Sequence, residues 1–105
     1  MSFSILQLFG LDDSVIRNKL IEGAVIVDVR PPHQYDQGKI PHSLNIPIEQ
    51  IEKNAGYLRR LKKPIILCGS GSDSGSAKRI LQQHGLKDVH NGGRWYKVLR
   101  IMKSL

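Results

Sequence analysis

Short apolar runs alternate along this chain with segments whose apolar residues follow helical spacing. Residues 24–29, around Val25-Ile26-Val27, and residues 65–67 form the two most apolar runs. Such runs are typical of strands buried on both faces. Shorter strands are expected at residues 43–46, between Pro41 and Pro47, and at residues 86–90. A weaker signal at residues 2–8 predicts a short edge strand.

The segments between these runs predict helices. One follows Asp12 or Asp13, carries Val15, Ile16 and Leu20 inward and ends at Gly23. The other helices are expected as a single turn over 32–36, a helix over 48–61 weakened at Gly56, one after residue 73 that ends at Gly85, and a terminal one from Trp95. Asn91-Gly92-Gly93 is expected to turn the chain into the terminal helix. Buried strands alternating with helices predict a single α/β domain over residues 1–105, with a mainly parallel central sheet covered by helices on both faces.

Composition narrows the class of protein. The chain has 105 residues, of which 40% are hydrophobic and 24% charged, as expected of one small folded domain. The first residues lack a basic segment followed by a long apolar run, and no apolar run is long enough to span a membrane, so a cytoplasmic location is expected. The formal charge of +7 favours anionic ligands. Aromatic residues are few and no nucleic-acid motif is visible, so neither a nucleic-acid nor a membrane partner is expected.

The candidate chemistry centres on the only cysteine, Cys68, which excludes an internal disulfide. It follows the apolar run 65–67 and precedes a loop of glycine, serine and aspartate that opens into a helix. Loop N–H groups and the helix dipole favour a thiolate, with a pKa lowered from about 8.5 to roughly 3.5–7.5. The alternative is a buried structural cysteine. No spacing of histidines and cysteines indicates a metal site.

Three segments resemble the signatures of the rhodanese-like domain family. The first signature is similar to residues 26–30 followed by Gly38-Lys39-Ile40-Pro41-His42 and the segment to Pro47. The strand, loop and helix around Cys68 resemble its active-site loop, and Asn91-Gly92-Gly93 before Trp95 resembles its C-terminal signature. The resemblance implies a small three-layer α/β fold. It also implies transfer of sulfane sulfur through a persulfide on Cys68.

The implied reaction requires no metal or organic cofactor. A small anionic donor such as thiosulfate, or a persulfide donor protein, would load Cys68, and a thiol or cyanide would accept the sulfur. The residues expected to bind the anion are those of the loop together with one arginine: Gly69, Ser70, Gly71, Ser72, Asp73, Ser74 and Arg30. Arg30 could instead pair with Asp28, which is expected to anchor a nearby loop.

Two positions depart from the family pattern. Asp73 stands where related rhodaneses carry a basic residue, and Lys39 stands where histidine is more common. The carboxylate of Asp73 either faces Cys68 and weakens turnover, or caps the helix that follows. A non-catalytic sulfur carrier or protein-interaction module is therefore the alternative to an enzyme. Phosphatases of similar fold carry an arginine six positions after the cysteine, where this chain has Ser74, so phosphoryl transfer is disfavoured.

Overall fold

Four parallel strands form the centre of the domain in the computed structural model, which describes residues 13–105. The sheet order is β2-β1-β3-β4, formed by β1 (Val25–Asp28), β2 (Leu44–Asn45), β3 (Ile65–Gly69) and β4 (Val89–Arg94). The parallel α/β sheet predicted from the apolar runs is confirmed. The edge strand expected at residues 2–8 lies outside the described residues.

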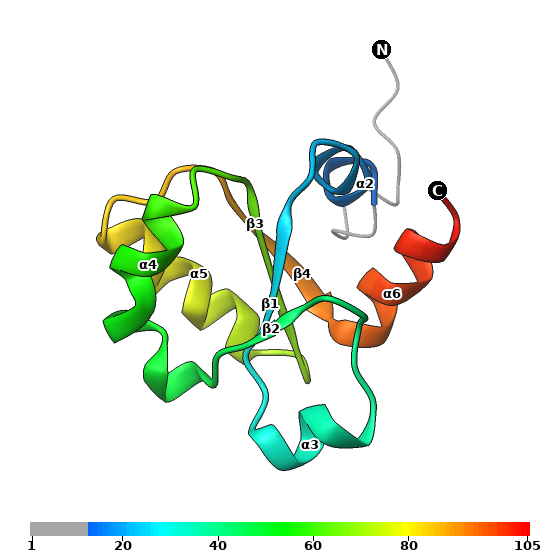
Figure 1. The fold of residues 1–105 in the computed structure, drawn as a ribbon, viewed down its shortest axis with the longest axis horizontal. Coiled ribbons are helices and arrows are strands. Elements are labelled where there is room, and N and C mark those ends of the chain that lie inside the picture. Colours follow the sequence, from blue (N-terminus) through cyan, green and yellow to red (C-terminus); the bar gives the residue numbers. More distant parts are fainter. Residues whose placement is uncertain (1–12) are drawn as a thin grey trace.

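Helices cover the sheet on both faces, which gives three layers. Helices α4 (Ala55–Arg60) and α5 (Asp73–Gln83) lie on one side of the sheet, and α2 (Ser14–Ile21) and α6 (Trp95–Lys103) lie on the other (Figure 1). The short helix α3 (Pro32–Gln37) follows β1 and corresponds to the predicted single turn. None of the described helices has both the length and the apolarity needed to cross a bilayer.

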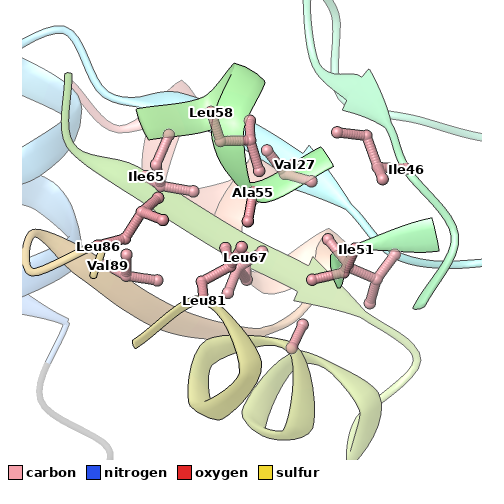
Figure 2. Packing of buried hydrophobic residues seen from close by; sticks show 12 residues of the cluster. Val27, Ile46, Ile51, Ala55, Leu58, Ile65, Leu67, Leu81, Leu86 and Val89 are labelled. Atoms are coloured by element: carbon pink, nitrogen blue, oxygen red, sulfur yellow. The ribbon is translucent and has the colours of Figure 1, made fainter. Parts of the chain in front are cut away.

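Alternation along β3 divides the core in two. Successive side chains of a strand point to opposite faces, so Ile65 and Leu67 pack under α4 and α5 (Figure 2). Ile66 and Cys68 point to the opposite face, where Val98 of α6 covers them. All five residues of β3 are buried, as a central strand between two helical layers requires. The thiol therefore belongs to the α2–α6 side of the sheet.

Two helix predictions need correction. Residues 48–61 do not form one helix but two 3₁₀ turns, η1 (Ile48–Gln50) and η2 (Glu52–Asn54), followed by α4. In a 3₁₀ turn residues i and i+3 lie on the same side, which lets Ile48 and Ile51 both pack against the core. Val15 is 52% exposed because its neighbour Ile16 takes the inward position, and adjacent helical residues face different directions.

The Asn91-Gly92-Gly93 segment was predicted as a turn, and this is wrong. It continues β4 to Arg94, with an irregularity in the pairing opposite Leu67 and Cys68. The absence of a side chain at Gly92 explains the difference. A Cβ there would lie 2.7 Å from Val98 Cγ2 and 2.9 Å from Ile66 Cγ2, so glycine lets α6 pack closely over the sheet.

Gly92→Ala is expected to lower the free energy of unfolding by about 1–3 kcal/mol, because the added methyl overfills a packed core. Urea unfolding measures the change. Gly75→Ala is the matched control, since a Cβ at that position would meet only Asn91 Nδ2, at 3.4 Å, and alanine favours the helix. Equal stability of the two variants would contradict the packing argument.

Candidate active site

Cys68 lies near the carboxyl end of the central strand β3, on the side of the domain where all four parallel strands end. It pairs in register with Asp28 of β1 and Gly93 of β4. Its exposed fraction is 0%, and it belongs to the apolar cluster that includes Ile26 and Val98. No molecule outside the protein can touch the sulfur in this conformation.

This burial changes the acid–base chemistry of the thiol. Loss of solvation, the largest cause, and the nearby Asp28 carboxylate raise the pKa of Cys68 to about 12, against the Arg30 guanidinium, which lowers it. The prediction of a lowered pKa for Cys68 is therefore wrong for this structure, in which the thiol is fully buried. The loop N–H groups were expected to dominate, but desolvation of the sulfur is the largest cause of the shift and no loop N–H group is among its causes.

Alkylation of Cys68 should follow this raised pKa. In the folded protein the rate is expected to climb with pH without levelling off near about 8.5, where a free thiol titrates, and to be at least about 100-fold slower than that of free cysteine at neutral pH. The measurement is the iodoacetamide rate against pH. The same protein in denaturant serves as the control and should react like a free thiol. An inflection below about 8.5 in the folded protein would show that the site stabilises the thiolate.

A buried ion pair lies beside the thiol. Arg30 donates from Nε to both carboxylate oxygens of Asp28, each at 3.0 Å, and from Nη2 to Oδ2 at 2.8 Å. The same guanidinium donates to the carbonyl of Gly38 at 2.6 Å and lies 4.5 Å from the ring centroid of Trp95. The pairing of Arg30 with Asp28 and the anchoring role of Asp28 are thus confirmed. The guanidinium therefore holds the segment after β1 in place close to Cys68.

The loop after Cys68 is short and is held at the end where α5 begins. Gly71 has a φ of 152°, a backbone angle that residues with side chains rarely adopt. Ser74 is buried, and its hydroxyl donates to Asn91 Oδ1 at 2.7 Å, an oxygen that also accepts from the N–H of Gly93 at 2.9 Å. Ser74 thereby ties the start of α5 to β4. Its role as an anion donor, like those of Gly69 and Gly71, stays a prediction.

The remaining loop residues face outward. Ser70 donates to Gln34 Oε1 over a long 3.3 Å, and Ser72 and Asp73 are exposed. Asp73 is the first residue of α5 and Ser72 precedes the helix, so Asp73 does not cap a helix that begins after it. A carboxylate in the first turn is still favoured by the helix dipole. The charges that shift the pKa of the thiol are those of Asp28 and Arg30, not that of Asp73.

A hollow of about 710 Å³ opens next to the loop. Its walls come from the segment after β1, the loop and the junction of β4 with α6, and are formed by Arg30, Gln34, Gln37, Gly38, Ser70, Arg94, Trp95 and Tyr96. Arg94 and Tyr96 were not predicted as site residues. The sequence held no signal for Arg94, because the pattern predicted a turn at residues 91–93, whereas β4 continues through them and ends at Arg94. Trp95, the first residue of α6, is partly buried and packs against the cluster around Cys68.

Fold and site together define a small parallel α/β domain that holds a single cysteine near the carboxyl end of its central strand. The model of the rhodanese-like domain matches residues 13–93, and the chain belongs to that family.

Several curated relatives of the chain have sulfur-related names. Thiosulfate sulfurtransferase PspE of Escherichia coli is 33% identical over 69 residues, which cover 64% of this chain and 66% of that protein. YrkF of Bacillus subtilis, named for a sulfur-carrier role, is 36% identical over 70 residues, which cover 67% of this chain but only 38% of YrkF. A rhodanese from Escherichia coli solved with anions matches with a TM-score of 0.64 and 28% identity, covering 70% of this chain and 89% of that one. The domain is therefore related to sulfur transfer.

Proposed function

We propose that this domain is a sulfurtransferase that carries sulfane sulfur as a persulfide on Cys68. The donor is thiosulfate or another persulfide, and the acceptor is a thiophilic molecule such as a thiol or cyanide. The observation that carries the proposal is the place of Cys68, the sole cysteine, on β3 beside the Asp28–Arg30 pair and directly before a glycine-serine loop. The similarity to PspE supports the same chemistry.

The reaction balances without a cofactor. The thiolate of Cys68 attacks the outer sulfur of thiosulfate, the bond between its two sulfurs breaks, and sulfite leaves with the electron pair. Cys68 then carries an anionic persulfide. An acceptor such as cyanide takes the outer sulfur, which leaves as thiocyanate, and the Cys68 thiolate is restored.

The burial of Cys68 requires the site to open during this cycle. Because the side chain has no exposed surface, a donor can reach it only after neighbouring structure moves, and residues 70–72, which directly follow β3, are the segment proposed to move. These residues are all glycine or serine, and the long Ser70–Gln34 hydrogen bond is a weak restraint. Opening would hydrate the sulfur and remove the main cause of its raised pKa, while Arg30 would continue to favour the thiolate. The persulfide would then lie against the N–H groups of the loop.

A second candidate function is a sulfur carrier or interaction module without appreciable turnover. The buried thiol with its raised pKa favours the carrier, because Cys68 is unreactive until the structure around it opens. The chain also matches only 38% of YrkF, so a related domain in that protein works beside further sequence. In this case a protein partner would open the loop and exchange sulfur directly with Cys68.

Intact mass spectrometry tests the two candidates. Incubation of the pure protein with thiosulfate is expected to add one sulfur atom, and cyanide is expected to remove it with release of thiocyanate. Repeated turnover with both reagents supports the enzyme. Loading only from a persulfidated protein donor supports the carrier. No loading from either kind of donor would overturn sulfur transfer for this domain.

A further inference from the structure

A second hollow, here called the cationic hollow, lies at the end of the sheet opposite Cys68. Its volume is about 320 Å³, and its lining includes Ile65 and Val89, the first residues of β3 and β4. Cys68 follows Ile65 by three residues, about 10 Å along an extended strand. In Figure 1 this end of the sheet lies on the side away from α3. A ligand in the cationic hollow would therefore leave residues 70–72, at the other end of β3, uncovered.

Exposed cations surround the cationic hollow, and none of them is neutralised. They come from the end of α4, the segment before β3 and the segment before β4: Arg59, Lys62, Lys63 and Lys87. Within residues 13–105, no carboxylate lies within ion-pair distance of these side chains. The carboxylate in the lining, Asp88, is already paired with Lys19 at 3.1 Å and with His90 at 2.6 Å. The cationic hollow thus keeps an uncompensated positive charge and favours an anionic partner.

The backbone fixes part of this arrangement. Arg59 donates from Nη1 to the carbonyl of His84 at 3.0 Å, which leaves the other N–H groups of its guanidinium available. Lys62 has a φ of 53°, in the left-handed region that residues with side chains rarely adopt. His42, with a φ of 69°, is the other non-glycine residue in this region within the described part of the chain. Strained backbone of this kind is concentrated at binding and switch sites.

An apolar groove of about 490 Å³ continues from the cationic hollow, and Lys63 lines both. The groove includes Val25 and Leu44, the first residues of β1 and β2. Its other walls come from α2, α4, α6 and the segments next to them, and include Leu20, Tyr57, Leu61, Met102 and the strained His42. The cationic hollow and the apolar groove together extend across the amino ends of all four strands. They form one elongated surface with a charged part and an apolar part.

We propose that this surface docks a protein partner through an extended segment in which an acidic run adjoins an apolar run. The carboxylates meet the cations of the hollow, and the apolar side chains enter the groove beside Tyr57. A small inorganic anion would leave the groove empty, and a purely apolar molecule would leave the cations unpaired. The inference goes beyond sulfur transfer, because the surface lies at the opposite end of the sheet. A partner bound there would hold the domain while a donor or acceptor reaches Cys68 from the other side.

Fluorescence anisotropy with labelled peptides tests this surface. One peptide joins a run of glutamates to a run of leucines and serines, in either order, and the other carries serine in place of every leucine. The leucine peptide is expected to bind saturably and about five- to tenfold more tightly than the serine peptide, because its leucines are removed from water. Raising the ionic strength to about 1 M should weaken the binding of both, since exposed charges are then screened.

A matched pair of charge variants tests the cationic hollow. Lys63→Glu combined with Lys87→Glu is expected to weaken the binding of both peptides by about tenfold or more, because attraction becomes repulsion. Arg100→Glu combined with Lys103→Glu changes the net charge equally at exposed positions of α6, outside the hollow and the groove. This second pair should weaken binding far less.

A matched pair of aromatic variants tests the groove. Tyr57→Ala is expected to remove most of the preference for the leucine peptide, because Tyr57 lines the groove and is 45% exposed. Tyr96→Ala removes a ring of similar exposure, 48%, from outside the hollow and the groove, and should keep the preference. Thermal unfolding checks that every variant is folded.

A single-stranded oligothymidylate with the same charge as the peptides tests the class of partner. Tighter binding of this oligonucleotide than of the leucine peptide would overturn the proposal in favour of a nucleic acid. Equal weakening by the two charge variants, equal affinity for the two peptides, or no saturable binding would also overturn it. The Lys63→Glu, Lys87→Glu protein should load sulfur from thiosulfate as fast as the α6 variant. Docking and sulfur transfer can therefore fail independently, since the peptides do not report on Cys68.

Discussion

Cys68→Ala is expected to abolish sulfur loading completely. Incubated with thiosulfate or with a persulfidated protein, the variant should gain no cyanide-removable sulfur in an intact mass measurement, because the chain has no other thiol. The effect is the largest expected of any single substitution here. Alanine is chosen over serine because the side chain packs among Ile66 and Val98, where an unpaired hydroxyl would be destabilising.

The control for this variant is its stability. Removing one buried sulfur atom leaves a small cavity, so the free energy of unfolding should fall by only about 1–2 kcal/mol. A folded Cys68→Ala protein that still loads sulfur would rule out the persulfide mechanism.

Asp28→Ala is expected to lower the free energy of unfolding by about 3–5 kcal/mol, because it leaves the Arg30 guanidinium buried without a counterion. Asp28 is 0% exposed and Arg30 6% exposed, so water cannot replace the lost carboxylate. Small domains have a total stability of about 5–15 kcal/mol, so this loss is a large fraction of the whole. Urea unfolding measures it.

Two further variants sharpen this test. Asp88→Ala, which removes an exposed carboxylate paired with Lys19 and His90, should change stability far less. Asp28→Asn keeps the shape of the side chain and removes its charge, so it should lower the pKa of Cys68 and speed alkylation. If Asp28→Ala and Asp88→Ala lower the free energy of unfolding by the same amount, the buried Asp28–Arg30 pair does not stabilise the structure around Cys68.

The sequence predicted the elements of the fold where local pattern and tertiary packing agree. The apolar runs became β1 and β3, and the helical spacing of Val98 and its neighbours became α6. The prediction failed at Asn91-Gly92-Gly93, where local glycine content favours a turn but the fit of α6 against the sheet keeps the strand extended. The conformation of residues 91–93 is set by their pairing with β3, a long-range contact that local sequence patterns do not show.

The candidate site was predicted less completely than the fold. The place of Cys68 at the end of a buried strand followed directly from the pattern around it. Its full burial did not, since that depends on the packing of α6 over the strand, and neither did the raised pKa that burial causes. Arg94 was not predicted as a site residue. The position of its side chain became clear only when β4 was extended to include it.

The central pairing of the sheet joins distant parts of the chain. Val25 of β1 pairs with Ile65 of β3, 40 positions later, while β2 lies outside this pair. Closing a loop of this length has an entropic cost that must be met before the strands gain their contacts, which places such domains among the slower two-state folders. During synthesis the pairing of the two strands cannot be completed until Cys68 has left the ribosome. Since Cys68 lies on the later strand, its thiol remains open to oxidants and electrophiles until the sheet closes, and the loss of its reactivity during refolding marks the moment of closure.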